Sequence, residues 1–527
     1  MSTLAPALAG PAPLRRRRPP LALGLASCLV ALLLLLPLAF LLLEARQVGW
    51  GQLSALLFRQ LTASLLWNMA RLAAVVTVAA AAIGTLAAFL VERTDLPGRR
   101  VLGPLLLLPL AVPDFVIAFG WISLAPAVRG YWGAVLVMTM GLYPLVYLPV
   151  AASLRGADPS QEETARTLGQ GPWRTFWHVT LRRARPTILA GCLLVSLALL
   201  AEYGAFEILG YQTFTTEIFT EFQVSFNVPT ACALSLVLVV LGGVILGAEP
   251  AARGKGRAVR TGAQAQRASR RHRLGRATLP VHGALALLVA LALGVPVGTS
   301  VFWMFAGGVP FLTGVSVLDA GWHTALYSGV AAALATLLAL PVALLAVRHS
   351  GRGGRLLERS TYLVLAMPGI VIALAISYFA ERYAGGFGYQ SAPLLIAAYA
   401  ILFFPLALVG VRASVAHAPV ALEEAARSLG RRPDEVFLRV TLPLIGPGLA
   451  AAFCLVFLAC ATELTATLVL VPTGVQTLAT QFWAYQQNLS YGQAAPFALV
   501  IIAIAAVPSY VLARHFDRLP SRAGSAS

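Results

Sequence analysis

The sequence predicts an all-α polytopic membrane protein built from two parallel repeats of six spans each. Of its 527 residues, 58% are hydrophobic and 11% are charged, and the mean hydropathy is +0.79. A soluble protein this apolar could not cover its surface with polar groups. Apolar runs of roughly 20 residues, the length needed to cross a bilayer, recur along the chain. A polar motif also occurs once in each half, which indicates an internal repeat.

The apolar runs define about twelve expected spans in two groups. The first group covers residues 21–43, 65–91, 101–124, 132–153, 187–205 and 229–248, and the second covers 279–305, 322–347, 360–380, 392–413, 448–470 and 493–513. The resulting organisation is a disordered cytoplasmic tail (1–20), a first transmembrane domain (21–248), a basic cytoplasmic linker (249–278), a second transmembrane domain (279–513) and a cytoplasmic tail (514–527). Parallel repeats of this kind imply a pseudo-two-fold axis along the membrane normal.

The repeated polar motif begins at Glu162 in the first half and at Glu423 in the second, 261 positions later. It reads Glu-Glu-Thr-Ala-Arg-Thr-Leu-Gly in the first copy and Glu-Glu-Ala-Ala-Arg-Ser-Leu-Gly in the second. We refer to residues 162–181 as the first elbow and to residues 423–442 as the second elbow. A polar loop this long, repeated in register within a very apolar chain, requires an explanation of its own.

Each elbow has the sequence of a short helix, a turn and a second helix. Acidic residues in the first turn suit the helix dipole. Gly169 and Gly430 stand where a helix ends in a left-handed residue or the chain turns closely. Pro172 and Pro433 can then open the second helix. Such an elbow is suited to docking a soluble partner, and a solvated connector without a partner is the alternative.

The pattern Glu-Glu-x-Ala-x-x-x-Gly, with a proline seventeen residues after the glycine, resembles the cytoplasmic loop of binding-protein-dependent ABC importer permeases. In that family the loop carries the coupling helix, which sits in a groove of the ATP-hydrolysing subunit. The first copy departs from the pattern at Thr164, and at Arg182, where the second copy has Pro443. The resemblance covers residues 60–250 and 320–515. It implies two permease units fused in one chain, with the type I ABC importer permease fold.

The resemblance also implies partners and roles. Two copies of an ABC ATPase subunit would engage the elbows, and an extracytoplasmic solute-binding protein would deliver the solute. ATP and Mg²⁺ would bind the ATPase, and no cofactor is expected on this chain. The chain has no Gly-x-x-x-x-Gly-Lys-Ser/Thr loop and no visible nucleophile–base constellation. The chain is therefore expected to be a transport subunit and not an enzyme. The residues expected to couple to the ATPase are Glu162, Glu163, Ala165, Gly169, Glu423, Glu424, Ala426 and Gly430.

The solute is less closely defined than the class. Segments 214–218 and 476–480 most resemble ferric-iron permeases of this family. Fused thiamine permeases share the layout, and sulfate, polyamine and phosphonate permeases share the elbow. A proton- or sodium-coupled secondary transporter is a hypothesis from another class, but it would leave the repeated elbows unexplained. A scaffold or membrane enzyme is a more distant alternative.

The distribution of Lys and Arg predicts the orientation. With the N-terminus inside, cytoplasmic segments hold 34 of the 39 basic residues, which the positive-inside rule favours. The remaining five are Arg46, Arg59, Arg71, Arg129 and Arg382. We therefore expect a multi-pass protein of the bacterial inner membrane, with both termini and both elbows in the cytoplasm. The arginines at 15–18 and the apolar segment after them indicate a retained first span and not a cleaved signal peptide.

The net charge of +18 does not indicate nucleic-acid binding. Nine basic residues lie in the linker without aromatic interleaving or a folded module, so we expect the linker to rest on anionic lipid. The five cysteines all fall in apolar runs without a Cys-x-x-Cys spacing, and the seven histidines have no ligand-like spacing. The sequence therefore predicts no metal site in this chain.

Three acidic residues lie at apparent membrane depth: Glu202, Glu463 and Asp114. The two glutamates are related by the repeat, whereas the counterpart of Asp114 is Gly369. Ionisable groups inside a bilayer are costly and usually face a cavity or a partner. We expect the glutamates to line a gate or vestibule, with a structural hydrogen bond or salt bridge between helices as the equal alternative.

The segments that follow the two glutamates, 211–226 and 472–491, contain aromatic residues and a matched pair, Thr216 and Thr477. They are expected to form re-entrant or interfacial pieces that close the pathway outside and meet the binding protein. An amphipathic surface loop is the alternative.

Overall fold

A computed structural model describes residues 20–155, 164–165, 167–225, 227–248, 272–307, 315–349, 351–383 and 390–518. Within these residues all regular structure is helical, apart from one isolated bridge between Thr94 and His272. The long helices of the first half are α1 (Leu21–Val48), α3 (Gln60–Arg93), α4 (Arg99–Leu105), α5 (Asp114–Leu124), α6 (Gly130–Leu142), α7 (Pro144–Arg155), α10 (Leu181–Ala201) and α13 (Val228–Gly247).

The second half repeats this order. Its long helices are α15 (Thr278–Val289), α16 (Val295–Ala306), α17 (Val315–Arg348), α18 (Arg352–Thr361), α19 (Gly369–Tyr383), α20 (Ala392–Leu402), α21 (Phe404–His417), α24 (Leu442–Ala461) and α27 (Tyr491–Arg518). A π-helical segment, η4 (Ala290–Gly294), joins α15 to α16. The last helix, α27, ends at Arg518 and so extends into the segment 514–527 that was predicted as a cytoplasmic tail.

The described residues contain nine helices long and apolar enough to cross a membrane, or up to eleven if each of two bent pairs is one span. These pairs, Arg99–Ala111 with Asp114–Leu124 and Ala392–Leu402 with Phe404–His417, bend by 95° and 55°. Eleven of the twelve expected spans are thus found. The expected span 360–380 is instead divided between α18, the 3₁₀ segment η5 (Tyr362–Ala366) and α19.

The break in this span has the same cause in both halves. Pro113 stands between η1 (Leu108–Ala111) and α5, and its counterpart Pro368 stands between η5 and α19. The residues before them, Val112 and Met367, have extended backbones, as a following proline requires. The repeat therefore preserves a broken helix, which divides both 101–124 and 360–380.

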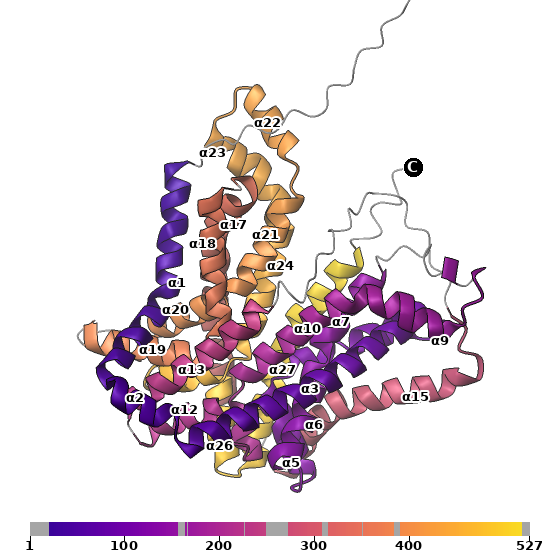
Figure 1. The fold of residues 1–527 in the computed structure, drawn as a ribbon, viewed down its shortest axis with the longest axis horizontal. Helices are drawn as coiled ribbons and strands as arrows, with labels where there is room; N and C mark the ends of the chain where they lie inside the picture. The colour runs from indigo at the N-terminus through magenta and orange to yellow at the C-terminus, as the bar shows by residue number, and fades with distance from the viewer. Residues whose placement is uncertain are drawn as a thin grey trace, which may run out of the picture.

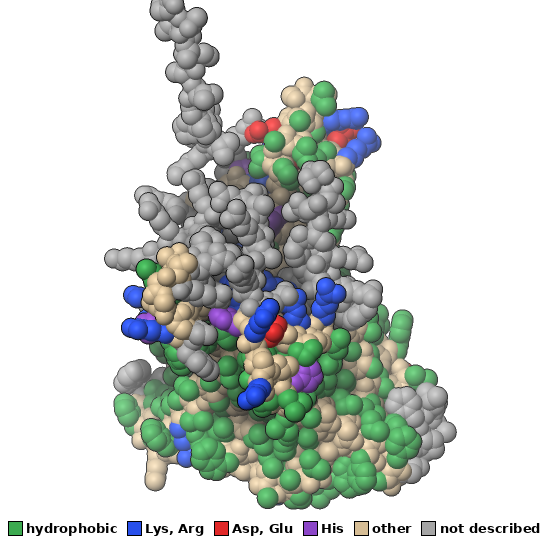
Figure 2. All heavy atoms as spheres, turned by 90° about the vertical axis from the view of Figure 1, so that its right-hand side faces the viewer, with side chains coloured by type: hydrophobic (Ala, Val, Ile, Leu, Met, Phe, Trp, Pro, Cys, Tyr) green, Lys and Arg blue, Asp and Glu red, His purple; other side chains and the backbone are tan. Residues whose placement is uncertain are grey.

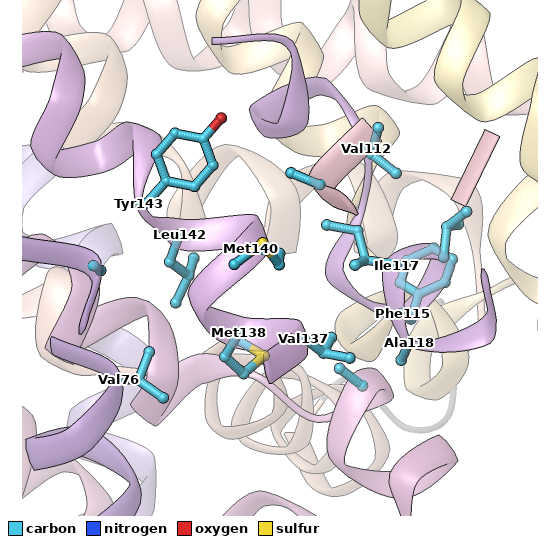
Figure 3. Packing of buried hydrophobic residues seen from close by; sticks show 14 of the residues in the cluster. Val76, Val112, Phe115, Ile117, Ala118, Val137, Met138, Met140, Leu142 and Tyr143 are labelled. Carbon is cyan, nitrogen blue, oxygen red and sulfur yellow. The ribbon is translucent and has the colours of Figure 1, made fainter. Parts of the chain in front are cut away.

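The first span of each half packs on the other half. Helix α1 contacts α17, α18 and α19, and α16 contacts α5. An added Cβ at Gly120 of α5 would lie 2.6 Å from Pro296 Cα, so glycine permits the close crossing of α5 and α16. Each of the two hydrophobic clusters consequently includes side chains from both halves, and Figure 3 shows part of the cluster around α5 and α6.

Figure 1 shows two arms that diverge from a common base. Two short helices, α22 (Val420–Ser428) and α23 (Pro433–Val436), lie at the tip of one arm, and α9 (Pro172–Thr175) lies at the tip of the other. Helix α26 (Leu478–Gln487) lies near the base. In Figure 2 hydrophobic side chains cover most of the lower body, whereas Lys and Arg gather above it. This separation suits a protein embedded in a bilayer with a charged face on the elbow side.

The described end of the predicted linker is attached to the first half. The Asp95 N–H donates to the His272 carbonyl oxygen at 3.0 Å, and the His272 N–H donates to that of Arg93 at 2.8 Å. The short helix η3 (Gly275–Ala277) then leads into α15. The rest of the linker lies outside the described residues.

Candidate functional site: two elbows and a cavity between the halves

Both elbows turn at the expected glycine. Gly169 has φ +79° and Gly430 has φ +81°, the left-handed conformation predicted from the sequence. In the second elbow the Gly430 N–H donates to the Arg427 carbonyl and the Arg431 N–H to that of Ala426, so the end of α22 has both bonds of a Schellman motif. The equivalent Gln170 N–H donates to the Ala165 carbonyl oxygen at 3.0 Å.

Each turn is followed by a proline-initiated helix and a π-helical segment. Helices α9 and α23 begin at Pro172 and Pro433. The π segments Phe176–Thr180 and Phe437–Thr441 then lead directly into α10 and α24. Single π turns in helices frequently mark functional positions. Each elbow is thus continuous with a membrane-spanning helix.

The two glutamates of the second elbow face different surroundings. Glu424 is exposed, whereas the Glu423 side chain is buried, with its Oε1 2.9 Å from Arg348 Nη2. The same nitrogen donates to the Ala418 carbonyl oxygen at 3.0 Å. Arg348, at the end of α17, therefore holds the elbow against a second span. Sequence reasoning assigned Glu423 to the ATPase and missed Arg348. An arginine also stands at the equivalent position of the first half, Arg93, and this was a signal.

Apolar side chains are exposed at the tips of the elbows. Leu168 is 76% exposed and Leu429 is 82% exposed. Ala165 is buried, and Ala426 is half-buried. Each leucine therefore offers one exposed apolar side chain at the turn of its elbow. Glu162 and Glu163 lie outside the described residues.

A cavity of about 260 Å³ lies between the two halves. All three predicted carboxylates line it: Asp114 from α5, Glu202 after α10 and Glu463 after α24. The structure thus brings together acidic residues up to 349 positions apart in the sequence. Among the described residues, no group of three His, Cys, Asp or Glu could hold a metal ion.

The two glutamates have the same local geometry. Glu202 Oε1 accepts a hydrogen bond of 2.7 Å from the Ala205 N–H, and Glu463 Oε1 accepts one of 3.0 Å from the Ala466 N–H. Each carboxylate therefore satisfies the start of a short helix, α11 (Gly204–Leu209) or α25 (Thr465–Leu470). The carboxylates thus line a cavity, and each also makes a hydrogen bond to the short helix that follows it. That bond is local, and no ion pair to either glutamate is found in the described part of the chain.

Asp114 has no acidic equivalent in the second half, and the space around it differs accordingly. An added Cβ at Gly141 would collide with Asp114 Oδ1. At the equivalent place an added Cβ at Gly369 would lie 2.8 Å from Glu463 Oε1 and 3.4 Å from Leu402 Cδ2. In the first half Asp114 on the broken span thus lies opposite Gly141 on the next helix. In the second half the glycine, Gly369, is on the broken span, and the larger residue, Leu402, is on the next helix.

In the outer segments, one residue pair of the predicted repeat was wrong. Both form short helices, α12 (Phe214–Gln223) and α26, that begin with a threonine capping box. The N-cap residues are Thr213 and Thr477, so Thr477 is equivalent to Thr213 and not to Thr216. The second half has three more residues between α25 and α26, a local insertion that a constant offset could not reveal.

Two similar helical units with a polar cavity between them define a membrane permease. The family described as binding-protein-dependent transport system inner membrane component matches residues 80–248 and 335–522, one match in each half. The chain belongs to this family of ABC transport permeases.

Individual relatives transport different solutes according to their names. The chain is 38% identical over 503 residues to the Fe(3+)-transport system permease protein FbpB 2 of Haemophilus influenzae, which covers 95% of this chain and 99% of the relative. It is 30% identical over 250 residues to the sulfate transport system permease protein CysT of Escherichia coli, covering 43% of this chain and 89% of the relative. With the molybdenum transport system permease protein ModB of Escherichia coli, identity is 32% over 139 residues, or 23% of this chain and 60% of the relative.

Proposed function

We propose that the two halves form one pathway for ferric iron in an ATP-driven importer. The observation that carries the solute class is the identity to an Fe(3+)-transport permease along almost the whole of both chains. The cavity supports it, because its described lining has three carboxyl groups and no basic side chain that would bind a bare dianion such as sulfate or molybdate. Iron would be the transported substrate and not a resident metal ion, because no group of three described His, Cys, Asp or Glu residues could hold one.

In this proposal two copies of an ABC ATPase engage the elbows, and a binding protein delivers the solute from the other side. Both termini and the elbows are cytoplasmic, which the distribution of basic residues supports. The exposed Leu168 and Leu429 would enter the ATPase grooves. ATP and Mg²⁺ would remain on the ATPase.

The continuous helices suggest how ATP hydrolysis acts on the pathway. Helix α10 connects the first elbow to Glu202, and α24 connects the second elbow to Glu463. A helix of 20 residues is about 30 Å long, so a movement of an elbow would reach the cavity through one continuous helix in each half. ATP-driven approach of the elbows would rock the two arms between inward-open and outward-open states.

Radiolabelled uptake tests the solute. Cells that lack their own ferric-iron importer would express the chain with its ATPase and binding protein, and uptake of ⁵⁵Fe would be compared with uptake of labelled sulfate, molybdate and thiamine. We expect ATP-dependent accumulation of iron alone. Transport of another solute in place of iron would contradict the assignment, and uptake without the ATPase would favour an ion-coupled transporter.

Reporter fusions test the orientation. Reporters inserted in the 249–278 linker and at the C-terminus should both report a cytoplasmic location. An external location of the linker would contradict the division into two six-span halves.

A further inference from the structure

A second, much smaller pocket lies behind Glu463. Its volume is about 10 Å³, and it is lined by residues of α17, α20, α24, α25 and α26: Thr324, Tyr327, Ser328, Tyr399, Cys460, Ala461, Glu463, Thr467, Thr477 and Ala479. Glu463 lines both this pocket and the central cavity. Its side chain therefore separates the two spaces.

One side chain in the small pocket lacks a partner. Ser328 is 1% exposed, and its Oγ has no hydrogen-bond partner among the described residues. Several other hydroxyl groups of the pocket are bonded: Tyr399 contacts Thr467 Oγ1, and Thr324 Oγ1 accepts from the Leu478 N–H at 2.9 Å. A buried hydroxyl without a partner is costly, so Ser328 indicates a ligand that the protein atoms do not supply.

In the first half apolar side chains occupy three of the equivalent positions, although Thr213 remains polar opposite Thr477. The repeat places Ala73 opposite Ser328, Met138 opposite Tyr399 and Phe206 opposite Thr467. Met138 and Phe206 are fully buried. The lining beside Glu463 is thus polar at three positions where the first half has apolar side chains.

We propose that the small pocket binds a single water molecule between Ser328 and Glu463. A volume of about 10–15 Å³ is what one water needs, and the site offers the two to four polar partners that a buried water requires. The water satisfies the Ser328 hydroxyl and gives the second glutamate a polar partner on the side away from the cavity. Glu463 can then keep a hydrogen bond when the cavity changes shape, whereas Glu202 has only its helix cap.

The sign of a stability change tests the site without any assumption about the solute. If water is bound, Ser328→Ala removes one of its ligands and should lower the melting temperature of the purified protein by about 1–3 °C. If the pocket is dry, the same change removes an unpartnered hydroxyl and should leave the melting temperature unchanged or raise it. Ser235→Ala is the matched control, since this buried serine donates to the Ala231 carbonyl at 2.7 Å.

A direct view and a functional cycle complete the test. A density map that resolves ordered waters should show one peak beside Ser328 Oγ, and an empty pocket would overturn the proposal. A melting temperature that rises with Na⁺ at constant ionic strength would overturn it in favour of a bound cation.

The functional part rests on the proposed pathway and has its own readout. Ser328→Ala combined with Glu463→Gln should deviate from additivity in uptake by at least about twofold, whereas Ser328→Ala with Glu202→Gln should be additive. Additive effects in both pairs would contradict the bridge to Glu463. Loss of iron specificity with the water still present would refute the proposed solute alone.

Discussion

The two halves of the molecule share their mechanical parts and differ in the chemistry of the cavity. Both have a glycine-terminated turn, a π-helical segment and a long helix that ends at a glutamate capping a short helix. Around these glutamates, however, the first half adds Asp114, and the second half adds the polar pocket behind Glu463. The elbow and the helix that follows it are thus alike in the two halves, whereas the polar groups around the cavity differ.

Ion pairs are found near the ends of the helices in both halves. In the second half Arg348 holds Glu423, and Arg412 contacts Glu358. In the first half Arg155 pairs with Glu92 at 2.9 Å. Ion pairs therefore hold the ends of described helices in both halves.

The strongest test of mechanical equivalence is at the turns. Gly169→Val and Gly430→Val should each lower uptake by at least about tenfold, because a β-branched residue is strained at positive φ. An added Cβ meets no atom within 4 Å at either position, so membrane insertion should persist. ATP hydrolysis and uptake would be measured together in proteoliposomes. Normal coupling in both variants would remove this role from the elbows.

The reversed pairing around Asp114 can be broken and rebuilt. Gly141→Leu alone should overpack the site and cost about 1–3 kcal/mol or more, since its side chain collides with Asp114. Adding Asp114→Gly reproduces the Gly369 and Leu402 arrangement of the second half and should restore the melting temperature. A double variant as unstable as Gly141→Leu would show that the halves are not interchangeable here.

A smaller effect is expected at the second elbow. Arg348→Gln removes the arginine that lies 2.9 Å from the buried Glu423. The loss of folding stability should lie between about 1 kcal/mol, the value for exposed ion pairs, and about 3–5 kcal/mol, the value for buried ion pairs. Uptake per ATP hydrolysed should fall severalfold. Adding Glu423→Gln should recover part of both losses, and strictly additive losses would argue against the pair.

The smallest effect concerns pH near the same elbow. Burial, and then the charge of Arg427, lower the pKa of His349 from its ordinary value of 6.5. The unfolded chain therefore takes up a proton at a higher pH than the folded protein, so stability decreases as the pH falls below about 6.5. His349→Gln should make the melting temperature less dependent on pH between about 7 and 5. An unchanged pH profile would contradict this role.

Much of the fold followed from local properties of the sequence. Apolar runs, the register of the repeat and the two glycines predicted most of the spans and the left-handed turns. Hydropathy could not predict that α1 and α16 pack on the opposite half, because it does not encode which helix is the neighbour. It also could not divide 360–380, where a proline interrupts an otherwise apolar run.

The sequence identified residues of the candidate site but not how they are arranged in space. The repeat identified Glu202 and Glu463, yet only the packing of the halves places them on one cavity with Asp114. The Arg348 contact depends on how α17 ends relative to α22, which no short motif records. The polar pocket could not be predicted, because Ser328 and Tyr399 belong to no recognisable motif in the sequence.

Parallel measurement of Glu202→Gln and Glu463→Gln tests the central claim most directly. Both changes keep the side-chain shape and an oxygen that can cap the following helix, so both proteins should reach the membrane and bind the ATPase. The account predicts that ⁵⁵Fe uptake falls in both, and falls further for Glu463→Gln, because Asp114 leaves a carboxylate in the first half. Equal losses, or wild-type uptake in either variant, would contradict it.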